Sequence, residues 1–343
     1  MLRCRNCGVP RLFSFSNKWT DDGILLSMPR RLVRLIMMER EHMVEIFQGI
    51  EEKLGFPIDR IITEAKRKDA FSYVQDVMPP LLGRLLRLPP LRRFAYYAMV
   101  EQAALIGLGK VKLLEHRNRE RLVGRIDPVY YHALFSGDAW GAFENFEGLR
   151  ARMEYGFFGH ELFVVIMACE DEQEGQRLRL REKPAIAAHA DYERCPVCGV
   201  PGELSSFRWE PETGRMIDGR TGEWVFIQGI RALDAVLREL EFELGEEIPG
   251  LVADLTWKFF RRMKEEHPGL FGDLAFLKVR GIGVPDIERP TPSDLETGLN
   301  IRNGFNGPIL AGMVAAVYGG DHPAWSWDSP AEGIIRVKIG GAP

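Results

Sequence analysis

The sequence predicts an α+β protein made of two homologous repeats that are related by a pseudo-two-fold axis. The first observation is a shared motif, Cys-x-x-Cys-Gly-Val-Pro, which begins at Cys4 and again at Cys195. The second is that other features recur at nearly the same offset, so that Trp19 corresponds to Trp209. The third is the order of patterns within each copy, where helical periodicity comes first and strand-like segments follow.

The repeats occupy residues 1–169 and 195–343. The segment between them, 170–194, is charged and contains a proline, which is typical of a linker. The offset between the copies falls from about 190 near the start to about 174 between the LIGLG and VRGIG segments. The first copy therefore contains about 16 additional residues, which we place within 78–104.

Each repeat is expected to begin with a cysteine knuckle and a hairpin and to continue with two helices. The hairpin segments LFSFSNKW-TDDG-ILLS and LSSFRW-EPETG-RMI carry glycine-containing turns between alternating residues. The first helix is predicted over 31–54 and 223–244, because apolar residues recur there along one stripe. The second helix is predicted over 58–76 and 248–265.

The second part of each repeat is predicted to form a mainly antiparallel sheet with one packed helix. Glycine-rich strands come first, and the helix follows around 132–146 in one copy and 306–318 in the other. The closing strands are the apolar segments ELFVVIMAC and EGIIRVKI. Each copy is therefore an α+β unit with its helices before its sheet.

The paired cysteines predict a metal site. Thiolates are good zinc ligands, and a structural zinc site needs four of them. Cys4 and Cys7 would supply one half of a site, and Cys195 and Cys198 the other half. The knuckles resemble the halves of zinc-ribbon and rubredoxin-type sites, although residues 8–194 separate them where those sites have a short loop. The zinc ion could be held within one chain or between two chains.

Three other uses of these cysteines remain open, namely redox-active iron, a dithiol redox pair and free buried thiols. Structural zinc is preferred. A redox dithiol of the thioredoxin type would open a helix in a βαβ setting, whereas each pair here is followed by Val-Pro and a hairpin. The fifth cysteine, Cys169, ends an apolar strand and is expected to be a buried small side chain.

The later part of each copy resembles the vinyl-4-reductase-type domain, a regulatory and accessory small-molecule-binding fold. The resemblance covers 105–169 and 279–339 and is carried by the GLG and GIG segments, by LFSG and ILAG and by the closing strands. It implies a pocket between helix and sheet for an apolar or aromatic ligand. Members of the family often carry metal-binding cysteines at the end of this region, where this chain has only Cys169, so no metal site of that kind is expected.

Two clusters of residues are candidates for such a pocket, since apolar walls with a few polar groups are typical of small-molecule sites. Aromatic residues on a helix face more often belong to a core, and asparagines before a helix often cap it, so both clusters also have a purely structural interpretation. The candidate ligand residues are Tyr131, His132, Phe135 and Trp140 in the first copy and Arg302, Asn303, Phe305 and Asn306 in the second.

Charge and motifs limit the possible functions. The net charge of −4 gives no overall electrostatic basis for binding nucleic acid. The apolar segments are too short for a transmembrane helix, and the first residues lack the apolar core of a signal peptide, so a cytoplasmic protein is expected. No Walker loop, G-x-S-x-G or G-x-G-x-x-G motif is present.

The sequence therefore favours a non-enzymatic small-molecule-binding or accessory protein with a zinc site shared by its repeats. One alternative is an enzyme with an unrecognised active site in 122–148 or 298–320. Another is a scaffold that docks a protein partner through 78–100, a leucine-rich segment with four arginines and no acidic residue. The simplest interpretation of that segment is a helical hairpin packed on the body of the protein.

Overall fold

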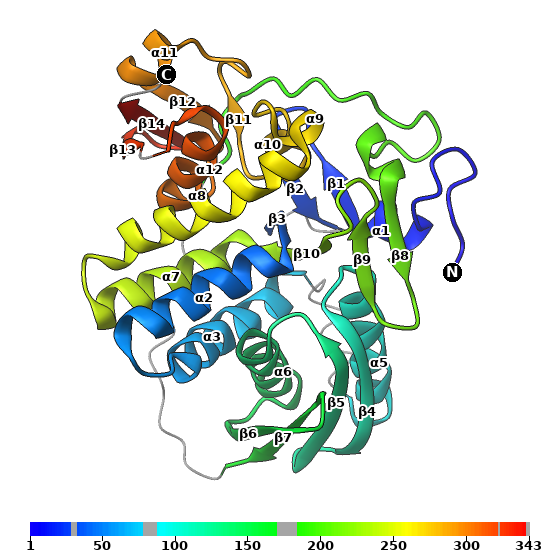
Figure 1. The fold of residues 1–343 in the computed structure, drawn as a ribbon. Helices are drawn as coiled ribbons and strands as arrows, with labels where there is room; N and C mark the ends of the chain where they lie inside the picture. Colours follow the sequence, from blue (N-terminus) through cyan, green and yellow to red (C-terminus); the bar gives the residue numbers. More distant parts are fainter. Residues whose placement is uncertain (29–32, 78–87, 170–183, 322, 341–343) are drawn as a thin grey trace.

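The computed structural model describes residues 1–28, 33–77, 88–169, 184–321 and 323–340. In these ranges it combines helices with three antiparallel sheets, as the predicted α+β class requires (Figure 1). The helices of the described part include none that is both long and apolar enough to cross a membrane. The internal duplication and its pseudo-two-fold axis stay predictions.

A six-stranded sheet contains strands from both halves of the chain, in the order β1-β2-β3-β10-β9-β8. Strands β3 and β10 pair at its centre, where Met38 lies opposite Phe226. The two halves therefore share one continuous sheet. Its strands are β1 (Asn17–Trp19), β2 (Leu25–Ser27), β3 (Arg34–Glu39), β8 (Phe207–Glu210), β9 (Arg215–Asp218) and β10 (Trp224–Gly229).

The structure also contains two four-stranded sheets, and one of the predicted helices packs on each (Figure 1). One has the order β4-β5-β7-β6 and carries α6, and the other has the order β11-β12-β14-β13 and carries α12. The predicted packed helices and closing strands are confirmed. The strands are β4 (Gly109–Arg117), β5 (Arg121–Val129), β6 (Ala151–Phe158), β7 (Glu161–Ala168), β11 (Val284–Pro285), β12 (Leu299–Arg302), β13 (Ala324–Ala331) and β14 (Ile334–Gly340).

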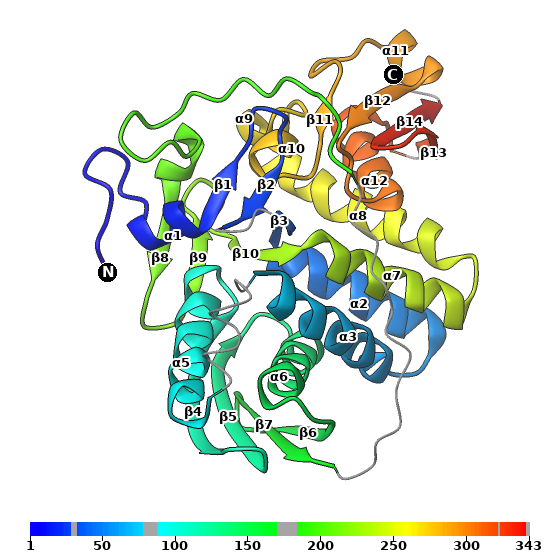
Figure 2. The same cartoon turned by 180° about the vertical axis from the view of Figure 1, so that it is seen from behind.

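Four long helices, α2, α3, α7 and α8, run beside one another in both views and separate the two smaller sheets (Figures 1 and 2). Helix α2 ends at Gly55, which adopts the left-handed conformation expected of a C-terminal glycine. The helices are α1 (Arg11–Ser16), α2 (Arg40–Leu54), α3 (Asp59–Val77), α5 (Pro89–Leu105), α6 (His132–Glu147), α7 (Ile230–Leu244), α8 (Ile248–Glu266), α9 (Pro268–Phe271), α10 (Phe276–Val279), α11 (Pro292–Thr297) and α12 (Gly307–Tyr318), with a 3₁₀ turn, η1 (Gly202–Ser206).

The prediction of one continuous helix over 31–54 and over 223–244 is wrong at the start of each span. Residues 34–39 form β3 and residues 224–229 form β10, and the helices begin only afterwards. All six residues of β3 are buried, since this strand lies inside the shared sheet. A strand that is buried on both faces is continuously apolar, and periodicity cannot distinguish it from a buried part of a helix.

The first arm of each hairpin is also shorter than predicted. The residues after the first knuckle form the short helix α1, and those after the second form the 3₁₀ turn η1, so the strands begin only at Asn17 and Phe207. Of the additional segment predicted within 78–104, residues 78–87 lie outside the described ranges, as do residues 170–183 of the predicted linker. The rest of the additional segment belongs to α5, which packs beside β4.

The hairpin of each half packs against the other half of the chain. The indole N–H of Trp19 donates to the carbonyl of Val279 (2.7 Å), and the indole N–H of Trp209 donates to the carbonyl of Leu105 (3.1 Å). The first hairpin is therefore bound to the second half of the chain, and the second hairpin is bound to the first half. Two backbone hydrogen bonds of 2.9 Å make the same crossing, from Met37 to Arg280 and from Ile227 to Ile106.

The core contains one histidine with no access to solvent. The imidazole of His42 stacks on the ring of Phe259, 5.1 Å away, and its Nε2 lies 2.9 Å from the hydroxyl of Thr256. Burial, together with the positive charge of Arg280, lowers the pKa of His42 to about 3. The folded protein therefore keeps this side chain neutral, whereas the unfolded chain protonates it below about pH 6.5.

This difference predicts a loss of stability in mild acid. The unfolded state binds the proton of His42 and the folded state does not, so the free energy of unfolding falls as the pH drops below about 6.5. The contribution lost between pH 8 and pH 5 is about 2 kcal/mol. Urea unfolding of the wild type and of His42→Gln at both pH values measures it. Equal acid-induced losses in the two proteins would contradict the prediction.

Candidate metal centre

The four cysteines of the two knuckles form one cluster within a single chain. Their sulfur atoms all lie within 4.8 Å of one another. The Sγ of Cys4 is 3.8 Å from that of Cys195, and the Sγ of Cys7 is 3.4 Å from that of Cys198. The prediction that the knuckles meet is confirmed. Cys169 is half-buried at the end of β7 and does not belong to the cluster.

Both knuckles fold through the same backbone hydrogen bonds. In the first, the N–H of Cys4 donates to Val9 (2.8 Å) and the N–H of Gly8 donates back to Cys4 (3.0 Å). Gly8 has a φ of +75°, which is favourable only for glycine and turns the chain sharply after the second cysteine. The second knuckle repeats this arrangement, with Cys195 to Val200 (2.9 Å), Gly199 to Cys195 (2.8 Å) and a φ of +73° at Gly199.

Backbone donors inside the knuckles favour thiolates over thiols at one cysteine of each pair. The N–H groups of Cys7 and Asn6 donate to Cys4 and lower the pKa of that thiol. Burial alone would raise the pKa of Cys195, but N–H donors including that of Cys198, together with the Asn6 amide, lower it to about 6. Burial raises the pKa of the other two, Cys7 and Cys198.

The sulfur positions suit a tetrahedral ion. A zinc–sulfur bond of about 2.3 Å places the sulfurs of a Cys4 site about 3.8 Å apart, close to the separations in this cluster. Four thiolates also complete the coordination of the ion and leave no position for water or substrate. The residues present therefore fit a metal whose role is structural.

Apolar residues from both halves enclose the cluster. Phe13 of α1 and Leu204 of η1 are fully buried beside it, and the ring of Phe13 meets that of Trp209 with centroids 4.9 Å apart. The carboxamide of Asn6 donates to the sulfur of Cys195 at 3.4 Å and so connects the first knuckle to the second. The centre therefore joins two parts of the chain that lie about 190 residues apart in sequence.

Three of the first four ligand candidates are in structural positions. Tyr131 and Phe135 are buried in the main core. The indole N–H of Trp140 donates to the carbonyl of Ala151 (3.0 Å), and the guanidinium of Arg67 lies 4.0 Å above its ring. These side chains are accounted for by packing and by contacts within the protein.

His132 is different because it lies partly at the surface in a polar contact. Its Nε2 is 2.8 Å from Asp59 Oδ2, and the hydroxyl of Tyr155 donates to the same oxygen at 3.0 Å. Burial alone would raise the pKa of Asp59, but the hydrogen bond and charge of His132 lower it. Asp59 begins α3 and Tyr155 lies on β6, so no spacing in the sequence indicated that they would meet His132.

Two of the four candidates in the second half bind other parts of the protein. The side-chain amide of Asn303 accepts from the N–H of Ile186 and donates to its carbonyl, each at 2.9 Å, and donates to Asp22 at 2.9 Å. Asn303 thus holds the described end of the linker. Arg302 pairs with Asp286 at 2.7 Å.

The other two candidates in the second half support α12. Phe305 is fully buried in the core. Asn306 caps the helix, since its side-chain oxygen accepts from the N–H of Ile309 at 3.2 Å. The two candidate clusters belong to different four-stranded sheets and do not form one site.

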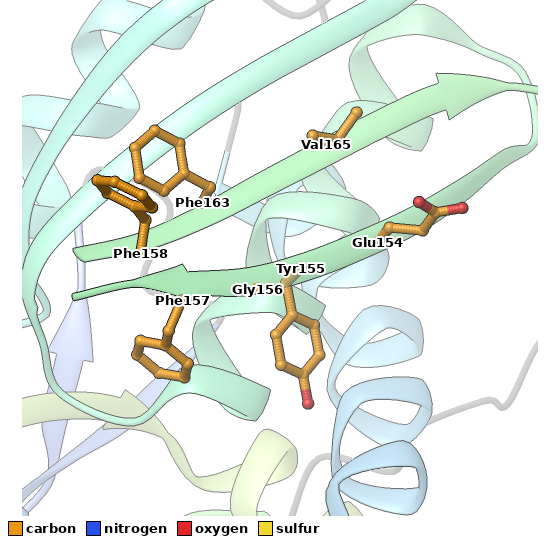
Figure 3. Close-up of a pocket in the computed structure, with 7 residues that line it drawn as sticks. All are labelled: Glu154, Tyr155, Gly156, Phe157, Phe158, Phe163 and Val165. Atoms are coloured by element: carbon orange, nitrogen blue, oxygen red, sulfur yellow. The ribbon is translucent and has the colours of Figure 1, made fainter. Parts of the chain in front are cut away.

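A shallow hollow of about 340 Å³ lies along β6 and β7 (Figure 3). The side chains of Phe158 and Phe163 point to one face of the sheet, and those of Tyr155 and Phe157 point to the other. None of the eight candidate ligand residues lines this hollow. Its lining residues are Glu154, Tyr155, Gly156, Phe157, Phe158, Phe163 and Val165.

Comparison with protein-family models, curated proteins and solved structures finds no match for this chain.

Proposed function

We propose that the chain is a non-enzymatic small-molecule-binding or accessory protein whose halves are joined by a structural zinc ion. The convergence of Cys4, Cys7, Cys195 and Cys198 carries the proposal. Because four thiolates fill the coordination of zinc, the ion connects the two hairpins and takes no part in a reaction. Iron can occupy the same donor set, and metal analysis separates the two ions.

Internal duplication is part of the proposal. Trp19 and Trp209, 190 residues apart, donate to carbonyls of Val279 and Leu105, which are 174 residues apart. These are the two offsets found in the sequence. Two copies of one unit that exchange their hairpins would produce these paired contacts, and each copy would contribute half of the zinc site.

We place the ligand contact of this accessory protein in the first half, at His132. The ionised Asp59 accepts from Nε2–H of His132, and in the neutral form of the imidazole Nδ1 is then an acceptor. The imidazole also lies against the rings of Tyr155 and Phe157, with centroids 5.7 Å away in each case. The vinyl-4-reductase-type resemblance implies an apolar or aromatic ligand, and an acceptor beside aromatic rings suits an aromatic ligand that also carries a hydroxyl or amine group.

A scaffold function is the second candidate, and one observation favours it. Leu91, Phe94 and Tyr97 of α5 are exposed by 37%, 67% and 43%, and their spacing places them along one side of the helix. These residues belong to the segment 78–100 that the sequence singles out for docking a protein partner. An exposed apolar stripe on a helix is typical of such surfaces.

Metal analysis of the purified chain tests the proposed zinc site. We expect one zinc ion per chain, lost in both Cys4→Ser and Cys195→Ser, while Cys169→Ser keeps it. Cobalt substitution of the wild type gives an independent measurement, because tetrahedral thiolate coordination has characteristic visible and near-ultraviolet bands. Zinc retained by either knuckle variant, iron in place of zinc, or octahedral cobalt spectra would overturn the proposal.

Native mass spectrometry of the same samples shows whether a small molecule copurifies and whether His132→Ala loses it.

A further inference from the structure

We infer that the first knuckle and α1 form a docking surface for an anionic lipid membrane. Leu2, Leu12 and Phe15 are exposed by 79%, 54% and 71%. Leu12 and Phe15 are three residues apart on α1 and therefore share one face of the helix. The carbonyl of Leu2 accepts from the N–H of Arg11 at 2.9 Å, so Leu2 lies beside the start of the same helix. We call these three side chains the apolar patch.

Basic residues are close to the apolar patch in the sequence. Residues 2–20 contain four basic residues and no acidic one. Arg5, Arg11 and Lys18 are exposed. The next acidic residue in the chain, Asp21, is paired with Arg194 at 2.7 Å. An apolar surface with basic neighbours is the combination that binds the interface of an anionic bilayer, because the apolar groups enter it while the cations attract the headgroups.

The second knuckle shows that the metal site does not require this surface. At the motif offset of 191 residues, Leu12 and Phe15 correspond to Glu203 and Ser206. Both knuckles hold a pair of cysteines in the same way, and the exposed apolar residue of the second knuckle is Val197 (61%), so only the first is followed by exposed apolar side chains at the positions of Leu12 and Phe15.

On the buried side of the two knuckles, the corresponding residues are apolar in both. Phe13 corresponds to Leu204, and both side chains are fully buried beside the cysteines. Packing therefore keeps the inward position apolar in both copies but does not determine the outward positions. Apolar side chains that are left exposed without a packing role point to an external partner.

The shape of the surface favours a membrane over other partners. Helix α1 lies at the edge of the molecule in both views (Figures 1 and 2). Its side chains Leu12 and Phe15 are exposed by more than half. Exposed side chains can enter a fluid bilayer without a complementary groove, which a protein partner would have to provide. Phe15 is the one aromatic ring of the patch, whereas proteins that bind single-stranded nucleic acid stack successive bases on several aromatic side chains.

Vesicle cosedimentation tests the inference on the intact, metal-loaded chain. We expect binding to phosphatidylcholine vesicles with about 30% phosphatidylserine, weaker binding at high salt, and little binding to phosphatidylcholine alone. Leu12→Glu with Phe15→Ser, the residues of the second knuckle, should reduce the partition coefficient at least about ten-fold. Arg11→Ala with Lys18→Ala should reduce it about ten-fold or more on the anionic vesicles.

Phe242→Glu is the matched control, because Phe242 is 84% exposed on α7, away from the knuckles. It should bind vesicles as the wild type does, and metal analysis should give the same zinc content for every variant. Absence of binding by the wild type, unchanged binding by the Leu12/Phe15 variant, or an equal loss in Phe242→Glu would overturn the inference. So would patch-dependent binding of a single-stranded oligonucleotide or an acidic peptide without vesicle binding.

Discussion

Removal of the metal is expected to lower the unfolding temperature of this protein by about 10 °C or more. Structural zinc contributes roughly 10–16 kcal/mol of binding energy in small zinc domains. A fraction of that free energy, added to the stability of this fold, is enough for a shift of this size. The hairpins depend on the ion because their own strands are short. Strands β1 and β2 have three residues each, and the core cluster around them contains residues of both halves of the chain.

Calorimetry of the wild type with and without a chelator, and of Cys195→Ser, measures this shift. Trp19 and Trp209 report where the loss occurs, since both indoles are buried and would be exposed to water if the hairpins detached. Cys169→Ser controls for the loss of a thiol outside the cluster. Unchanged unfolding temperatures and unchanged tryptophan emission after complete chelation would show that the hairpins are held without the ion.

The cysteine cluster could be predicted because the ligand chemistry is contained in the motif itself. Two Cys-x-x-Cys-Gly knuckles specify four sulfurs whatever fold lies between them. The intervening residues leave two possibilities, a site within one chain or one between chains. The pairing of β3 with β10 joins the two halves and so brings the two knuckles of one chain together. That pairing cannot be recognised from the apolar pattern alone.

The surroundings of His132 could not be predicted for a related reason. Its partners Asp59 and Tyr155 come from the start of α3 and from β6, and neither stands in a recognisable motif. Asn303 shows the opposite case, in which a polar residue before a helix suggests a ligand contact but instead holds the linker through Ile186. Long-range polar contacts depend on how elements pack, which local periodicity does not encode.

The buried ion cluster around Lys66 depends on packing in the same way. Its ammonium lies between α3 and α6, 3.0 Å from Asp138 and 3.4 Å from Asp69. The hydroxyl of Tyr130 donates to Asp138 at 2.9 Å. The side chains of Lys66 and Asp69 are each only 4% exposed. Burial alone would lower the pKa of Lys66, but the two carboxylates raise it, so the ammonium stays charged in the folded protein.

Replacing Lys66 by methionine is therefore expected to lower the free energy of unfolding by about 3–5 kcal/mol at pH 8, because two carboxylates lose their buried cation. The loss should become smaller towards pH 5. Burial raises the pKa of Asp138 and the Lys66 ammonium opposes this, so without the ammonium that pKa rises further, and protonation then stabilises the folded variant relative to the unfolded one. Asp69→Asn added to Lys66→Met should recover part of the loss, since it removes one unpaired charge with little change of shape.

Lys68→Met, on the same helix, should cost less than about 1 kcal/mol. Urea unfolding at both pH values measures all four proteins, and a loss in Lys66→Met that is as small as in Lys68→Met would show that the cluster does not stabilise the contact between α3 and α6.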